Sequence, residues 1–162
     1  MRQRIRFIIS GVALCAAVFT LNVNANTHSD HKITQQHAIR YIAYKPFSNF
    51  PLSGAVLVGH TLRVSGVGGD IQKNGKMSSD FAKQASQAMN NVGLLLKEGG
   101  SSYADVTACQ VYLVHMRDSK IFNGIYKTYF KPGRYPARTM VAVKELVGPD
   151  QQVEVTCDGV RQ

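Results

Sequence analysis

The sequence predicts an α+β fold in which a mixed β-sheet carries two helices on one face. The first observation behind this prediction is the order of patterns along the chain, strand–strand–strand–helix–strand–helix–strand–strand, with helices at 81–96 and 121–129. The second is the length of 162 residues with 44% hydrophobic residues, which suits one domain with its own core. Such a sheet has a second face, which so short a chain cannot also cover. We therefore expect self-association to cover that face.

Residues 1–25 have the pattern of a secretory signal peptide. Arg2, Arg4 and Arg6 give a positive start, an apolar run follows at 7–21, and Val23-Asn24-Ala25 is a small-residue cleavage site. The apolar run is shorter than the roughly 20 residues that a membrane span needs. We therefore expect cleavage, a periplasmic or secreted protein, and no membrane contact afterwards. An uncleaved N-terminal anchor is the alternative.

The segment after the cleavage site, 26–38, is polar and is predicted to be a flexible arm in front of a single domain at 39–162. If cleavage follows Ala25, His28 becomes the third residue of the mature chain, and its amine and amide nitrogens then suit a square-planar copper or nickel ion. This motif is short, and no other His, Cys or carboxylate cluster has ligand spacing. The prediction is that the protein holds no metal and no cofactor.

The first half of the domain reads as three strands and a helix. A strand is predicted at 39–44, and a hairpin at 55–58 and 62–65 around a Gly-His-Thr turn. Gly66 ends the hairpin at a place where the backbone is expected to approach another group closely, because no phosphate-loop lysine follows it. The helix that follows begins at Ser78 or Ser79 and ends at Gly99-Gly100. Its buried stripe is Phe81, Ala85, Ala88, Met89, Val92, Leu95 and Leu96.

The second half continues with a strand at 106–115 and a second helix capped by Asp118. A Lys-Pro-Gly sequence at 131–133 stops this helix. The face expected to be buried is Ile121, Phe122, Ile125, Tyr126 and Tyr129. Two more strands are predicted at 136–143 and 153–160, on either side of a Gly-Pro-Asp turn.

Signal cleavage removes Cys15 and leaves Cys109 and Cys157, both in predicted strands. An even pair in an oxidising compartment permits a disulfide, provided that the Cα atoms come within roughly 7 Å. Two separate buried thiols are the more common arrangement for cysteines in strands, and the spacing alone does not choose between the two arrangements.

Arg138 lies near the start of a strand that opens with Pro136, and it shares a strand face with Met140. A guanidinium so close to a core needs an anionic partner, and its fork of donors fits a carboxylate bidentately. Spacing alone favours an arginine at a strand end that is half solvated or paired with Glu154 or Asp158 of the chain itself. A bound carboxylate ligand is the functional alternative.

Several motifs, in order and spacing, resemble the RidA/YjgF family, also called L-PSP endoribonuclease. The resemblance runs from about Ile39 to Val160. The matching pieces are Pro-Leu-Ser-Gly-Ala-Val at 51–56, Val-Ser-Gly at 64–66, Val-Tyr-Leu at 111–113, Asn-Gly-Ile-Tyr at 123–126 with Phe130, Pro-Ala-Arg-Thr-Met-Val at 136–141 and Val-Glu-Val at 153–155.

This resemblance implies a chorismate-mutase-like fold and a homotrimer with clefts between subunits. It also implies hydrolysis of reactive enamines and imines of amino acids to 2-keto acids and ammonia, without a cofactor. In those terms Arg138 grips the substrate carboxylate, while Gly66 and Asn123 border the cleft.

Three positions depart from the family pattern. Thr156 stands where active members carry a water-positioning glutamate, Leu52 replaces a cleft tyrosine, and Met140 replaces a small residue and would narrow the pocket. A threonine can hold a water but cannot act as a base near neutral pH. Glu154 and Asp158, two residues to either side, could substitute for the lost glutamate.

The sequence therefore predicts an imine or enamine deaminase that is weakened at Thr156, with Arg138 and Thr156 as its catalytic residues. The alternative is a protein of the same fold that binds 2-keto or amino acids without turnover. The net charge of +9 raises a third possibility, a holdase-like or nucleic-acid-binding protein. No His/Lys pair or aromatic-basic stripe supports it, so no nucleic-acid partner is expected. Four cations in the second half, Lys120, Lys127, Lys131 and Arg134, are expected to form a solvated face.

Overall fold

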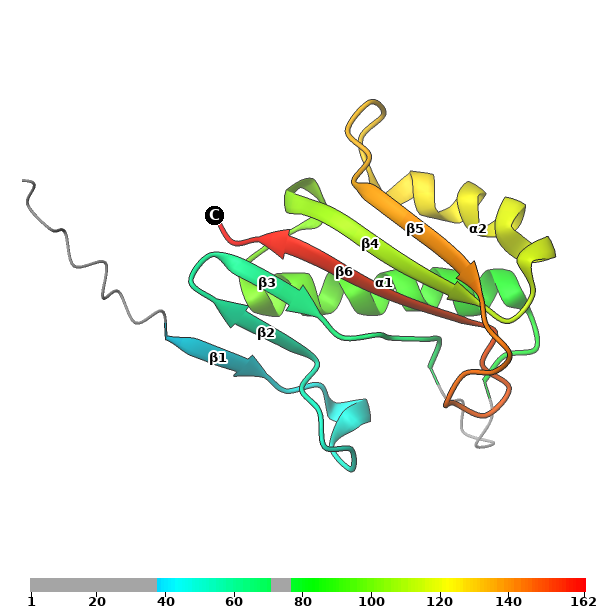
Figure 1. The fold of residues 1–162 in the computed structure, drawn as a ribbon, viewed down its shortest axis with the longest axis horizontal. Helices are drawn as coiled ribbons and strands as arrows, with labels where there is room; N and C mark the ends of the chain where they lie inside the picture. Colours follow the sequence, from blue (N-terminus) through cyan, green and yellow to red (C-terminus); the bar gives the residue numbers. More distant parts are fainter. Residues whose placement is uncertain (1–37, 71–76) are drawn as a thin grey trace, which may run out of the picture. The chain divides into compact units, whose positions relative to one another are not determined.

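The computed structural model describes residues 38–70 and 77–162 (Figure 1). The predicted signal peptide and almost all of the predicted arm lie outside these residues. No helix within the two described ranges is long and apolar enough to cross a membrane. The strands are β1 (Ile39–Ile42), β2 (Ala55–Val58), β3 (Thr61–Val64), β4 (Val106–Leu113), β5 (Ala137–Ala142) and β6 (Val153–Val160), and the helices are α1 (Phe81–Gly99) and α2 (Ser119–Tyr126).

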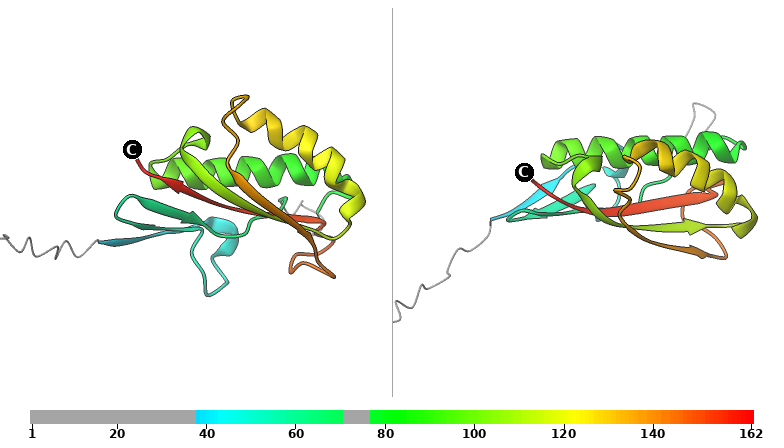
Figure 2. Two further views of the ribbon diagram at one scale, coloured as in Figure 1. Left: turned by 45° about the horizontal axis from the view of Figure 1, so that its top comes forward. Right: turned by 90° about the horizontal axis from the view of Figure 1, so that it is seen from above.

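The six strands form one mixed sheet in the order β1-β2-β3-β6-β4-β5 (Figure 1). Every neighbouring pair is antiparallel except β4 and β5, which run parallel because α2 forms the crossover between them. Figure 2 shows both helices on the same face of this sheet. The predicted fold class, a mixed sheet with two helices on one face, is confirmed.

Helix α1 packs against the sheet through the apolar stripe that its spacing predicts. All seven predicted stripe residues are buried. Gly100 ends the helix in the left-handed conformation, with φ 79°, which glycine adopts without steric cost. The predicted start is wrong by one or two residues. Asp80, not Ser78 or Ser79, is the N-cap, and its carboxylate accepts hydrogen bonds from the amides of Ala82 and Lys83.

Helix α2 is short and continues into a 3-10 turn at Lys127–Tyr129. Phe122 and Tyr126 are buried as predicted, but Ile121 is 48% exposed and does not belong to the buried face. Asp118 does not cap the helix with its side chain. It ends a preceding 3-10 turn, so its backbone is already helical rather than extended as side-chain capping requires.

The face of the sheet opposite the helices is covered by no described element. Along β6, Val153, Val155 and Cys157 are buried on the helix side, and the alternate residues face the open side. Strand β5 lies at the sheet edge, and five of its six residues are exposed. The predicted strand at 136–143 therefore forms, but in the single chain it is an edge rather than part of the core.

Cys109 and Cys157 form a disulfide, which is the first of the two arrangements that the sequence leaves open. The two cysteines stand directly opposite each other in the antiparallel β4–β6 ladder, with 4.1 Å between their Cα atoms. The sequence alone did not reveal this pairing, because β6 enters the sheet between β3 and β4, far from its chain neighbours.

Candidate functional site

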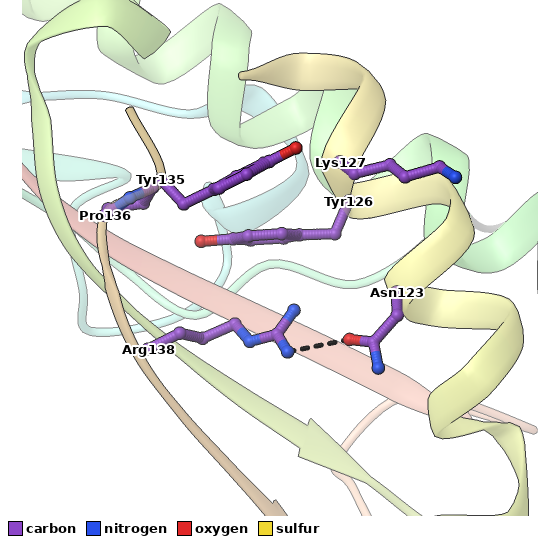
Figure 3. A pocket seen from close by; sticks show the side chains of 6 residues that line it. All are labelled: Asn123, Tyr126, Lys127, Tyr135, Pro136 and Arg138. Carbon is purple, nitrogen blue, oxygen red and sulfur yellow. Dashed lines mark hydrogen bonds between the residues drawn. The ribbon is translucent and has the colours of Figure 1, made fainter. Parts of the chain in front are cut away.

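Arg138 projects from the edge strand β5 onto the helix side of the sheet, next to α2 (Figure 3). Its Nη2 atom donates a hydrogen bond of 2.7 Å to Oδ1 of Asn123. Its guanidinium carbon lies 4.5 Å from the centroid of the Tyr126 ring and 6.0 Å from that of Phe122. The ring faces attract the cation and fix its plane, while the amide fixes one of its edges.

Neither predicted acidic partner reaches Arg138. Asp158 is bound by Arg63, with 3.0 Å between Nε and Oδ1, and Glu154 accepts a hydrogen bond of 3.2 Å from Gln151. No carboxylate of the described ranges forms an ion pair with Arg138. The internal ion-pair interpretation is therefore wrong, and the guanidinium keeps donors available for a ligand.

A hollow of about 320 Å³ lies beside this guanidinium (Figure 3). Its lining residues are Asn123, Tyr126, Lys127, Tyr135, Pro136 and Arg138. Tyr126 is only 4% exposed, and its hydroxyl has no hydrogen-bond partner among residues 38–70 and 77–162. Burial raises the pKa of Tyr126 to about 12, against a lowering effect of the Arg138 charge, so the phenol stays neutral at ordinary pH. The hollow thus combines two cations with aromatic walls.

Three other predicted site residues lie elsewhere in the chain. Thr156 is on β6, and its hydroxyl donates a hydrogen bond to the carbonyl of Val64. Gly66 follows β3, and a Cβ there would collide with the carboxylate of Glu154, so the expected close approach is present. Leu52 lies in the loop before β2 and is 49% exposed.

One chain does not bring all the predicted residues together. Arg138 pairs with Cys109 in the parallel β4–β5 ladder, and Cys109 pairs with Cys157 across β4 and β6. The side chains of all three residues lie on the helix side of the sheet. Thr156 is the neighbour of Cys157 along β6, so its side chain points to the open side. The structure joins Arg138 with Asn123 on one face and leaves Thr156 on the other. Met140, on the same face as Arg138, packs against the core and is not among the residues that line the hollow.

Sequence reasoning missed Lys127 and Tyr135 as lining residues, and it assigned Tyr126 only to the core. A usable signal for Lys127 was its spacing from Asn123, because residues four apart lie side by side on a helix. Tyr135 had no such signal, since it belongs to the loop before β5. Within the described ranges no three His, Cys, Asp or Glu side chains gather as a metal site requires. His28 lies outside those ranges.

Comparisons with known proteins agree with this architecture. The model of the family described as endoribonuclease L-PSP matches residues 43–160. The human 2-iminobutanoate/2-iminopropanoate deaminase is 38% identical over 97 residues, which cover 59% of this chain and 70% of the relative. The chloroplastic Reactive Intermediate Deaminase A of Arabidopsis thaliana is 30% identical over 139 residues, or 85% of this chain and 70% of the relative. The crystal structure of the YjgF gene product of E. coli superposes with a TM-score of 0.67 at 26% identity, covering 76% of this chain and 99% of that one.

Proposed function

This chain belongs to the endoribonuclease L-PSP family, which includes the RidA/YjgF proteins, and on that premise we propose that it hydrolyses 2-imino acids to 2-keto acids and ammonia. Enamine tautomers of the same acids enter the reaction as imines. Arg138 clamps the carboxylate of the substrate, and the imine carbon is presented to water.

The observation that carries this proposal is the state of Arg138. Its guanidinium has no acidic partner among the described residues, is held at one edge by Asn123 and lies against the Tyr126 ring. An internal ion pair would occupy the donors of the guanidinium. A guanidinium that is oriented but not neutralised therefore indicates a site for an anionic ligand rather than a structural role. A 2-imino acid supplies the planar carboxylate that this fork fits.

The reaction consumes one water and releases one ammonia. Water adds to the imine carbon and one of its protons passes to nitrogen, which gives a carbinolamine. The hydroxyl proton of the carbinolamine then passes to nitrogen as the C–N bond breaks, so ammonia leaves and the 2-keto acid remains. Thr156 holds this water as a hydrogen-bond acceptor, because its own proton is already donated to the Val64 carbonyl. Since a threonine does not take up a proton, turnover depends on orientation and is weaker than with a glutamate.

We place the complete site between subunits of a homotrimer. The support is that Arg138 and Thr156 lie on opposite faces of one sheet, so that the two can border the same ligand only across copies of the chain. The open sheet face gives a second copy a surface on which to pack. In this arrangement Asn123 and Arg138 come from one subunit, and Leu52, Gly66 and Thr156 come from its neighbour.

The second candidate is a protein that binds 2-keto or amino acids without turnover, and it is favoured by the presence of Thr156 in place of an acid. One assay separates the two candidates. An amino-acid oxidase generates an imine in situ, and ammonia release is followed with wild type and Arg138→Ala. The deaminase proposal expects acceleration by wild type only. Absence of acceleration by the folded wild type, together with Arg138-dependent binding of 2-keto acids, would favour the binding protein.

The protein is further proposed to be exported, through cleavage of residues 1–25, to the periplasm or the exterior. The disulfide between Cys109 and Cys157 supports this location, because such bonds persist in oxidising compartments. Intact-mass measurement of the protein purified from its own host tests it. A mature chain that begins at residue 26 is expected, and a full-length chain in the cytoplasm would contradict it.

A further inference from the structure

We propose that the hollow beside Arg138 selects substrates with a second anionic group, the 2-imino dicarboxylates, and that Lys127 receives this second group. The inference rests on the proposed function, since it assigns a substrate class to the same site. It differs from the named substrates of the curated relatives, 2-iminobutanoate and 2-iminopropanoate, which carry a single carboxylate.

The first support is the position of Lys127. Its backbone amide donates to the carbonyl of Asn123 and closes the last turn of α2, so the two side chains leave the helix one turn apart. Asn123 is the residue that holds Arg138. The ammonium of Lys127 therefore projects from a point about 5–6 Å along the helix from the amide that orients the clamp. Both residues line the same hollow.

The second support is that the ammonium of Lys127 has no partner in the part of the chain that the structure describes. It is exposed, and it takes part in no hydrogen bond or ion pair between side chains of the described ranges. In Figure 3 its ammonium extends away from the guanidinium. Because nothing holds the ammonium there, the four-carbon stem can swing it toward a ligand at the cost of side-chain entropy alone.

The third support is the charge of the chain segment that supplies the lining residues. From Ser119 to Lys144 the chain contains no acid and six cations, of which Lys127 and Arg138 line the hollow. The other four are Lys120, Lys131, Arg134 and Lys144. Asp118 lies at the opposite end of α2 from Lys127. A ligand with one carboxylate would neutralise only the charge of Arg138. A second carboxylate on the ligand would also pair with the ammonium of Lys127.

The test compares binding of two 2-keto acids, 2-oxobutanoate and 2-oxoglutarate, by calorimetry with wild type, Lys127→Gln and Lys131→Gln. Wild type is expected to prefer the dicarboxylate by about fivefold, the upper range for an exposed ion pair, and to lose this preference as salt is added. Lys127→Gln should bring the ratio of the two affinities close to one. Lys131→Gln, which removes the same charge outside the hollow, should keep the wild-type ratio.

Equal affinity of wild type for the two acids, or a preference that survives in Lys127→Gln, would overturn the inference. An equal loss in both variants would also overturn it, because the preference would then come from the general field and not from Lys127. Failure of the proposed function looks different. In that case Arg138→Ala would leave the binding of both acids unchanged.

Discussion

Replacing Asn123 by aspartate tests whether Arg138 must remain free of an internal negative charge. The change is isosteric and exchanges the Oδ1 acceptor, 2.7 Å from Nη2 of Arg138, for a carboxylate oxygen at the same place. The new carboxylate would pair with the guanidinium as a substrate does. It would also repel the substrate carboxylate from the same site.

The expected size follows from Coulomb's law. A unit charge at about 4 Å contributes about 1 kcal/mol in water and about 4 kcal/mol near a protein surface. Asn123 and Arg138 are both exposed, so solvent screening favours the lower half of this range, about 1–2.5 kcal/mol. Binding of a 2-keto acid should therefore weaken about 5- to 60-fold.

Calorimetry with 2-oxobutanoate measures this effect, and Asn123→Ala is the matched control. The alanine variant adds no charge and leaves the guanidinium in place, and it loses only the hydrogen bond that orients this exposed group. We expect a contribution of about 0.5–1.5 kcal/mol from that bond, so binding should weaken by only about three- to tenfold. Both variants should unfold at the wild-type temperature within a few degrees, because the side chain is exposed. If Asn123→Asp binds the ligand as well as Asn123→Ala does, Arg138 does not act as the clamp.

Three further predictions concern the water site, the disulfide and the buried tyrosines. Thr156→Glu should raise the rate constant of imine hydrolysis about 10- to 100-fold by adding a general base, and Thr156→Val should lower it. Equal rate constants in the wild type and both variants would show that Thr156 does not hold the water. Replacing Cys109 and Cys157 together by alanine should lower the free energy of unfolding by about 2–4 kcal/mol, because the bond closes a loop of 48 residues; urea titration measures the loss, and an unchanged midpoint would contradict it. Burial raises the pKa values of Tyr44 and Tyr126 to about 12, so the unfolded chain releases these phenol protons near pH 10 and the folded chain only near pH 12. The contribution to stability is complete below pH 10 and is lost as the pH rises through about 12, so urea midpoints that stay constant from pH 9 to 12 would refute it.

Much of the fold was readable from local patterns. The last strand has the predicted bounds, because residues 153–159 alternate strictly between buried and half-buried positions and Val160 is exposed at its end. The end of α1 at Gly100 was visible for a similar reason, since a left-handed residue there favours glycine. Asp80 as N-cap was not readable, because Ser78, Ser79 and Asp80 are all good capping residues and the choice depends on where the chain enters the helix.

Features that depend on the order of strands were beyond the sequence. Cys109 and Cys157 lie opposite each other only because β6 is the neighbour of β4. Asp158 pairs with Arg63 because β6 is also the neighbour of β3. Both follow from the placement of β6 in the middle of the sheet. The family resemblance named Arg138 and Asn123, but it did not reveal their mutual hydrogen bond or the Tyr126 ring beneath the guanidinium.

The most direct test of the central claim is a crystal structure of the full mature protein with 2-oxobutanoate bound. We expect the ligand carboxylate to lie on the guanidinium of Arg138 in a bidentate pair, beside Asn123, with Gly66 and Thr156 of a second subunit on the other side of the ligand. A ligand bound away from Arg138, or bound wholly within one chain, would contradict the account.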